Sequence, residues 1–251
     1  MARHGTVTIG IIGGTGLATL GERPTAVADS AETPFGLASG LPRRFAELPN
    51  AVFLNRHGDR HTVLPHLINY RANVWMMKNS GVDAIVAVFA VGGIARSLAD
   101  GDFVLPDQLV DYTWGRAHTF AGTDNFLHVD FSEPFDAGLR QALSRSADRI
   151  GLDLCDGVYG CTQGPRFETP AEIDRMERDG CTVVGMTAMP EAALARELDL
   201  PYAGICLVVN PAAGRGLVSL ELADMRKVVT DAEPTIRRLL VEFLQLVEQP
   251  G

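Results

Sequence analysis

Residues 83–91, DAIVAVFAV, constrain the fold of this chain more than any other segment of its sequence. An apolar run that is rich in β-branched residues and stops at a glycine pair is typical of a strand buried on both faces of a sheet. Such a strand belongs to a sheet that is covered by helices, which is the arrangement of an α/β protein.

Shorter apolar runs and amphipathic segments alternate along the rest of the chain. Strands are expected over residues 6–12, 25–29, 51–55, 102–109, 156–161, 182–185 and 202–209, and helices over 69–81, 136–150, 169–179, 190–198 and 223–248. Thr169, Pro170 and Glu172 predict a capping box at one helix start, and Pro234 marks a candidate break in the last helix. Because no change of composition marks a linker, residues 1–251 are predicted to form one domain around a mainly parallel sheet.

Composition excludes several classes of protein. Hydrophobic residues make up 46% of the chain, which is too many for a disordered segment. Lys and Arg total 22 against 31 Asp and Glu, which argues against a nucleic-acid surface. The four cysteines form no CxxC pair, and no apolar run has the length of a signal peptide or a membrane span. We therefore expect a cytoplasmic protein with reduced thiols that binds neither nucleic acid nor membranes.

Glycine-rich or polar residues follow nearly every predicted strand. Since ligands of open α/β sheets bind at the carboxyl ends of the strands, these tips predict one composite site. The first tip, GGTG at residues 13–16, has glycines that permit close backbone approach to an anion, and Thr15 adds a hydroxyl. A plain tight turn fits almost as well, because neither the dinucleotide fingerprint nor a P-loop is present.

The second tip contains Arg56, His57 and His61. The guanidinium of Arg56 is suited to bidentate contact with phosphate, and the two histidines are suited to donate to phosphate or ribose oxygens. A zinc site that also uses His66 is the alternative. Pro65 breaks helical geometry there and no carboxylate or cysteine completes a ligand set, so we expect no metal.

Two further tips place polar groups that suit a flat heterocycle. Phe167 can stack on a ring while Glu168 accepts a ring N–H, and Asn210 matches an edge that carries C=O beside N–H. The alternatives are that Phe167 belongs to the core, that Glu168 is an exposed charge at a helix start, and that Asn210 is a turn residue before Pro211.

Several motifs together resemble those of the trimeric purine nucleoside phosphorylase and methylthioadenosine phosphorylase family. They are GIIGGTGL, RHG with His61 beyond it, INYRAN at 68–73, QGPRFET, GMTAMPEA at 185–192 and Asn210. The resemblance extends from residue 8 to about residue 245. It implies a nucleoside phosphorylase fold around a twisted mixed sheet flanked by helices, and a homotrimer with its sites at subunit interfaces. It also implies phosphorolysis of the N9–C1′ bond of a nucleoside, with inorganic phosphate as co-substrate and no cofactor.

The same resemblance assigns roles to particular residues. Phosphate contacts are expected from Thr15, Arg56, His57, the backbone of Ala90 and Thr187. Substrate contacts are expected from Phe167 on the base, Met186 on the ribose, and His128, which members send into the neighbouring subunit's 5′ pocket. Phe89 departs from the family, which commonly has Thr or Asn there, so one polar contact to phosphate or sugar is missing.

The choice of purine follows from Glu168 and Asn210, which we expect to be the catalytic pair. Adenosine-type members place an Asp-x-Asp after the penultimate strand, whereas this chain has Asn210 followed by Pro-Ala. Glu168 matches the version used by 6-oxopurine enzymes, in which Glu accepts N1–H and Asn serves O6 and N7.

The 5′ side of the substrate is expected to be apolar. Residues 217–225 contain no His to meet a 5′-hydroxyl, and they contain Leu217, Leu220, Leu222 and Met225. This favours a methylthio group, so the expected substrate is S-methyl-5′-thioinosine. The alternatives are methylthioadenosine or inosine and guanosine as substrates, an NAD-dependent oxidoreductase that uses GGTG, and a catalytically silent ligand-binding module.

Overall fold

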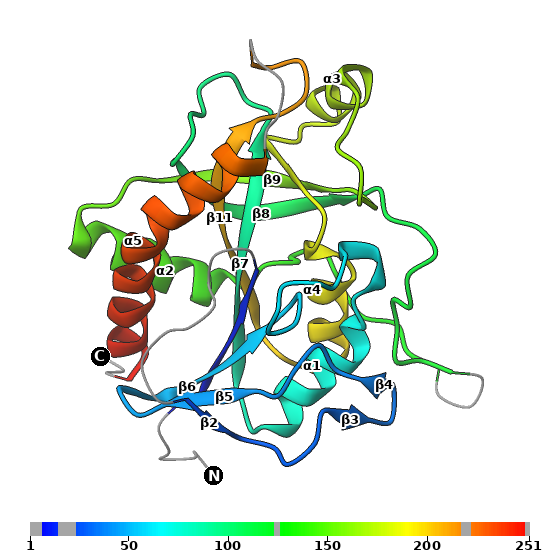
Figure 1. The fold of residues 1–251 in the computed structure, drawn as a ribbon, viewed down its shortest axis with the longest axis vertical. Helices are drawn as coiled ribbons and strands as arrows, with labels where there is room; N and C mark the ends of the chain where they lie inside the picture. Colours follow the sequence, from blue (N-terminus) through cyan, green and yellow to red (C-terminus); the bar gives the residue numbers. More distant parts are fainter. Residues whose placement is uncertain (1–6, 15–23, 123–125, 217–221, 249–251) are drawn as a thin grey trace.

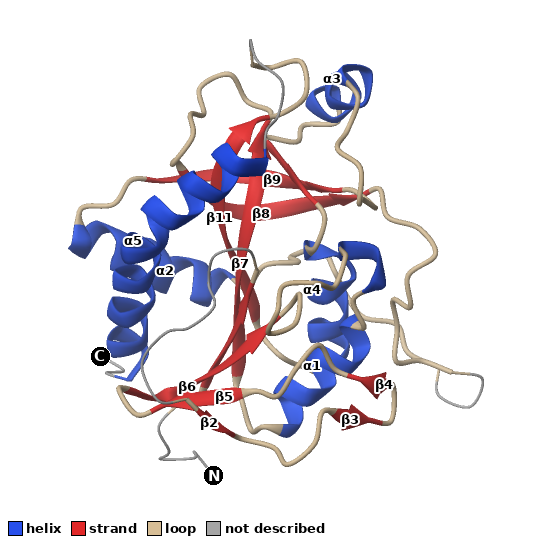
Figure 2. Ribbon diagram, viewed as in Figure 1, coloured by secondary structure: helices blue, strands red, loops and turns tan. Residues whose placement is uncertain are grey.

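The structure of the chain is a computed structural model that describes residues 7–14, 24–122, 126–216 and 222–248. The predicted α/β class is confirmed, since helices flank a twisted mixed sheet on both sides (Figures 1 and 2). The strands are β1 (Ile9–Gly13), β2 (Thr25–Ala26), β3 (Glu32–Thr33), β4 (Gly36–Leu37), β5 (Arg43–Phe45), β6 (Leu48–Asn55), β7 (Ala84–Gly93), β8 (Phe103–Asp111), β9 (Leu154–Cys161), β10 (Val183–Gly185) and β11 (Tyr202–Pro211). The helices are α1 (Tyr70–Asn79), α2 (Ala137–Ile150), α3 (Pro170–Arg178), α4 (Ala188–Glu197) and α5 (Leu222–Glu248), with a 3-10 turn at Pro65–Leu67.

The main sheet has the strand order β10-β9-β8-β11-β7-β1-β6-β5-β2. Its centre is parallel, with β1 between β6 and β7 and β11 beside β7, while β8 runs antiparallel to β11. Strand β10 also pairs antiparallel with β7, so this half of the sheet closes on itself. Sequence periodicity did not predict this closure, because it reports burial and not strand partners.

Strand β7 shows why the apolar run at residues 84–91 is uninterrupted. Val86 and Val88 pack in a cluster with α2 and α5, whereas Ala87 and Phe89 pack in a second cluster with α1 and α4. Successive side chains of a strand point to opposite faces, so a strand between two helical layers must be apolar at every position. Figure 1 shows α2 and α5 on one side of the sheet and α1 and α4 on the other.

The helix starts follow the capping signals of the sequence. Thr169 accepts from the backbone of Glu172, whose side chain accepts from the backbone of Thr169, so the predicted capping box is confirmed. The predicted break at Pro234 is wrong, because α5 continues through it. Proline removes one helical hydrogen bond, but Ala232 and Ile236 on either side are buried against the sheet, and this packing holds the helix together.

Four cysteines are free, and three of them, Cys161, Cys181 and Cys206, are buried, as expected for reduced thiols. Within the described ranges, no helix has both the length and the apolar character that crossing a membrane requires. Within the same ranges, no three His, Cys, Asp or Glu side chains are grouped in a way that could hold a metal ion.

Candidate active site

A cavity of about 310 Å³ opens where the carboxyl ends of several strands meet. Gly14, Arg56, Gly92, Met186 and Asn210 line it, and each lies at or just beyond the end of a different strand. The first turns of α5 and the segment 61–65 close its other side. The tips that follow the strands in the sequence therefore do converge on one cavity.

The structure brings together most of the residues expected to act in the site. Those expected to bind phosphate that line the cavity are Arg56, His57, Ala90 and Thr187. Those expected to contact the nucleoside that line it are Phe167, Glu168, Met186, Asn210 and Leu222. Thr15, Leu217 and Leu220 lie outside the described residues. His128 is not part of the cavity lining; it is exposed and packs edge-on against Phe126 at 4.6 Å.

Arg56 does not present its fork to the cavity as expected. Its Nε and Nη2 donate to the two carboxylate oxygens of Glu191 at 2.7 and 2.9 Å, and it is 0% exposed. Nη2 also donates to the carbonyl of Ile12, and Nη1 donates to that of Val88. Arginine has five N–H donors, so these bonds leave one N–H, on Nη1. The expected bidentate phosphate contact is therefore corrected to a single donor.

The remaining donor of Arg56 lies beside the first glycine turn. A Cβ at Gly14 would stand only 3.0 Å from Nη1, so a side chain at this position would crowd the guanidinium at the end of β1. An anion beside Gly14 could receive a charged hydrogen bond from Nη1.

Glu191 is the buried residue that holds the guanidinium of Arg56 and raises its pKa, a role that was not identified from the sequence. It is 0% exposed, and its Oε1 also accepts from the hydroxyl of Tyr202 at 2.8 Å. Burial alone lowers the pKa of Arg56, but attraction and hydrogen bonds from Glu191 outweigh it and hold that pKa above its ordinary value. The only signal was its place within GMTAMPEA, because a partner 135 residues away leaves no local pattern.

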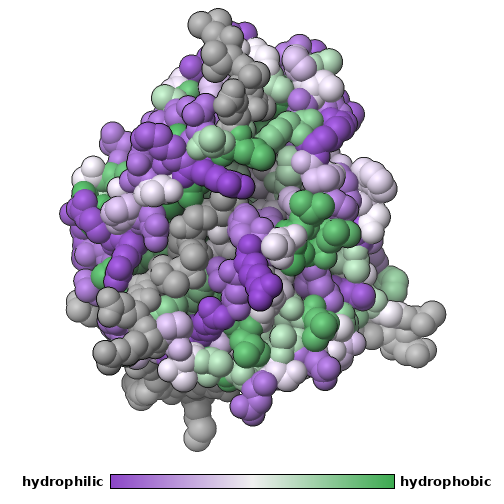
Figure 3. Space-filling view, in the orientation of Figure 1, coloured by the Kyte–Doolittle hydropathy of each residue, from purple (hydrophilic) through white to green (hydrophobic). Residues whose placement is uncertain are grey.

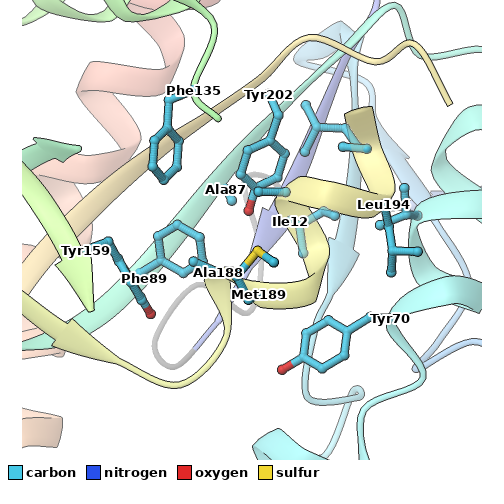
Figure 4. Packing of buried hydrophobic residues seen from close by; sticks show 14 of the residues in the cluster. Ile12, Tyr70, Ala87, Phe89, Phe135, Tyr159, Ala188, Met189, Leu194 and Tyr202 are labelled. Atoms are coloured by element: carbon cyan, nitrogen blue, oxygen red, sulfur yellow. The ribbon is translucent and has the colours of Figure 1, made fainter. Parts of the chain in front are cut away.

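Phe89, the departure from the family pattern, supports Arg56 instead of facing the cavity. Its ring lies 4.8 Å from the guanidinium carbon and is 1% exposed. It also packs edge-on against Tyr159 at 5.2 Å in the cluster shown in Figure 4. The aromatic face attracts the buried cation, so Phe89 exchanges a polar contact for a cation–π contact.

His57 is held in one tautomer. Its Nδ1 lies 2.8 Å from the carbonyl of Val63, which can only accept, so Nδ1 carries the hydrogen and Nε2 has a lone pair. Burial, reinforced by repulsion from Arg56 and His61, lowers the pKa of His57 to about 4. At neutral pH its Nε2 is therefore an acceptor for an O–H of phosphate or ribose, which corrects the expected donor role.

The low pKa of His57 predicts a pH-dependent stability. Between its unfolded pKa near 6.5 and its folded pKa near 4, the unfolded chain binds more protons, so the free energy of unfolding falls as the pH drops. We expect His57 to account for a loss of about 2 kcal/mol between pH 7.5 and pH 5. Urea unfolding should show a smaller loss in His57→Gln than in the wild type, and parallel losses would contradict the assignment.

One part of the cavity is built around Glu168. Its Oε1 accepts from the hydroxyl of Thr162 at 2.6 Å, which orients the carboxylate and leaves Oε2 for a ligand. Glu168 lies directly before Thr169, the N-cap of α3, but it is half-buried at the cavity and bonded to Thr162, so it is not the exposed helix-start charge of the alternative interpretation. Phe167 is 40% exposed at the cavity, so it is not a core residue.

Asn210, at the end of β11, also lines the cavity. The register of β11 against β7 shifts between Val208 and Asn210, which is the local bend of a bulge. The side-chain amide of Asn210 donates to the carbonyl of Pro211 at 2.6 Å, leaving its oxygen and one N–H for a ligand. This arrangement offers a donor and an acceptor to the edge of a heterocycle.

Comparison with known proteins agrees with these features. The family model of the phosphorylase superfamily matches residues 8–245. A probable S-methyl-5′-thioinosine phosphorylase of Pseudomonas syringae pv. tomato is 47% identical over 238 residues, 93% of this chain and 97% of that relative. A probable 6-oxopurine nucleoside phosphorylase of Thermococcus kodakarensis is 38% identical over 247 residues, 95% of this chain and 91% of that relative.

The fold also matches those of solved structures. A double variant of the adenosine/methylthioadenosine phosphorylase of Schistosoma mansoni, in complex with adenine, has a TM-score of 0.89 at 32% identity, over 98% of this chain and 93% of that one. The chain therefore belongs to the phosphorylase superfamily. The resemblance of its motifs to the nucleoside phosphorylases is confirmed.

Proposed function

We propose that the chain is a purine nucleoside phosphorylase that cleaves S-methyl-5′-thioinosine with phosphate, giving hypoxanthine and 5-methylthioribose 1-phosphate. The base end carries the proposal: Glu168 keeps one carboxylate oxygen for N1–H, and the amide of Asn210 keeps an N–H for O6 or N7. The Pseudomonas relative, a probable S-methyl-5′-thioinosine phosphorylase, and the Thermococcus relative, a probable 6-oxopurine nucleoside phosphorylase, support a 6-oxopurine as the base.

In the proposed reaction the N9–C1′ bond breaks with its electron pair going to N9, and a phosphate oxygen bonds to C1′ from the opposite face. The leaving purine carries negative charge until it gains a proton, so hydrogen bonds from the protein to the purine are strongest in the transition state. Asn210 supplies such a bond. Arg56 and the backbone near Ala90 would hold the phosphate, and we propose that no metal or organic cofactor takes part.

The 5′ end supports a methylthio substituent. Leu222, Met225 and Val229 from the first turns of α5 line the cavity, and Val63 and Leu64 line it as well. Burying a methylthio group against these apolar side chains is favourable. The polar side chains of His61, Thr62 and Arg226 line the cavity as well, so the preference over a 5′-hydroxyl rests on the apolar contact alone. Methylthioadenosine is the second candidate, favoured by the Schistosoma structures with adenine and methylthioadenosine.

Product analysis tests the proposed function. Incubation of the protein with S-methyl-5′-thioinosine should release hypoxanthine, detected by ultraviolet absorbance after chromatography, only when phosphate is present. Inosine and NAD serve as comparison ligands. Hypoxanthine release that is equally fast without phosphate, or no release from any nucleoside, would contradict it.

We also propose that the active form is a cytoplasmic homotrimer in which His128 enters the neighbouring subunit's site. His128 is exposed and outside its own cavity, and Phe126, which packs against it, is 84% exposed. Trp114, in the segment between β8 and α2, is 73% exposed. On the face shown in Figure 3, hydrophobic residues lie in groups among hydrophilic ones. Large exposed aromatic side chains are typical of protein interfaces.

Dilution is expected to inactivate the enzyme as the trimer dissociates, because each site then lacks His128. Analytical ultracentrifugation and activity measured over the same concentration range should give the same midpoint. His128→Ala should lower activity while leaving the sedimentation coefficient of the trimer unchanged. A monomer with full activity at assay concentration would overturn the proposal.

A further inference from the structure

Arg116 is a buried cation that forms no ion pair with the described carboxylates. It is 8% exposed, and its guanidinium donates mainly to main-chain carbonyls. Placing an arginine in such a site carries a desolvation cost that a neutral residue would avoid. Arg116 was not singled out from the sequence, because it lies between the strand predicted over residues 102–109 and the helix predicted over residues 136–150.

The bonds of Arg116 join two segments that line the cavity. Nη2 donates to the carbonyls of Thr162 and Gln163 at 3.2 and 2.8 Å, and Nε donates to Oε1 of Gln163 at 3.0 Å. Nη1 donates to the carbonyl of Met186 at 2.9 Å and to that of Met189. One planar group thus fixes the end of β9 relative to the turn between β10 and α4.

These two segments carry the groups that meet the two ends of the substrate. Thr162 orients Glu168 through its hydroxyl, and Met186 precedes Thr187 at the cavity. Arginine spreads its donors over three nitrogens of a rigid plane and so reaches carbonyls of both segments, whereas the three donors of a lysine ammonium all lie on one nitrogen and cannot reproduce this spacing.

We propose that Arg116 is a positioning residue that sets the orientation of Glu168, through Thr162, relative to Met186 and Thr187. This inference rests on the proposed function. It predicts that Arg116 contributes to the choice between 6-oxo- and 6-aminopurines without touching the base. A misplacement of a positioning element by about 1 Å typically costs on the order of 100-fold in rate.

The test compares Arg116→Lys, Thr162→Val and the double variant with the wild type. For each, kcat and KM are measured on S-methyl-5′-thioinosine and on methylthioadenosine. We expect both single variants to lower the 6-oxo over 6-amino ratio of kcat/KM at least tenfold, mainly through kcat on the 6-oxopurine. Since both act through Glu168, the double variant should lose no more of this ratio than the stronger single variant.

Arg140→Met is the matched control. Arg140 ties α2 to Asp156 at the start of β9 through one ion pair outside the cavity, so its loss should leave the ratio unchanged. If Arg116→Lys does not fold, Arg116→Gln takes its place, because Thr162→Val keeps the carbonyl that Arg116 binds and tests only the link from Thr162 to Glu168. An unchanged ratio in a folded Arg116→Lys or in Thr162→Val overturns the inference. Absence of phosphorolysis in the wild type would instead contradict the proposed function.

Discussion

Replacing Glu191 with alanine is expected to lower the free energy of unfolding by about 3–5 kcal/mol, because it leaves Arg56 as an unpaired buried cation. The carboxylate accepts two hydrogen bonds from Arg56 and one from Tyr202, and all three side chains are buried. Urea unfolding at pH 7.5 measures the loss, and the KM for phosphate should rise in whatever fraction remains folded.

Two further variants separate stability from phosphate binding. Glu242→Gln removes an exposed ion pair with Arg149 and should cost less than about 1 kcal/mol. The double variant Arg56→Met, Glu191→Leu removes both buried charges, so it should be more stable than Glu191→Ala, yet it should be inactive because the Arg56 donor to phosphate is gone. A Glu191→Ala protein as stable as Glu242→Gln would show that the buried pair is not the constraint we describe.

Asn210→Asp is expected to move the enzyme's preference from 6-oxopurines toward 6-aminopurines by a large factor. The amide of Asn210 can donate to O6 or N7, whereas a carboxylate can only accept, as the 6-amino group requires. A site that hydrogen-bonds a buried polar edge of its substrate can discriminate between two substrates by roughly 10⁴ in kcat/KM. Exchanging one of its donors for an acceptor should therefore remove much of that preference. The kcat/KM values for S-methyl-5′-thioinosine and methylthioadenosine measure it.

Asn210→Ala is the control for this exchange. It removes the donor without adding an acceptor, so it should slow cleavage of the 6-oxopurine and give no gain on the 6-aminopurine. If Asn210→Asp and Asn210→Ala change the two rates alike, Asn210 does not read the base.

Elements whose local pattern carries the information were predicted well from the sequence. The run in β7 marks a strand buried on both faces, and Thr169 with Glu172 marks the start of α3, because these signals involve neighbouring residues only. The convergence of the strand ends on one cavity followed from the parallel sheet.

Contacts between distant segments could not be predicted in this way. The guanidinium of Arg56 is a chemical group suited to binding phosphate, but two of its nitrogens donate to Glu191, far along the chain. Arg116 bridges two segments through main-chain carbonyls, which every residue type provides, so no sequence pattern marks its partners. The same limit applies to Pro234, where burial of the helix against the sheet outweighs a local helix-breaking signal.

The ratio of kcat/KM for S-methyl-5′-thioinosine to that for methylthioadenosine, measured with wild-type protein at saturating phosphate, tests the central claim most directly. Both substrates share the methylthioribose, so the ratio isolates the contribution of Glu168 and Asn210 to base recognition. The account predicts a ratio on the order of 10⁴ in favour of the 6-oxopurine. A ratio near one, or a preference for methylthioadenosine, would contradict it.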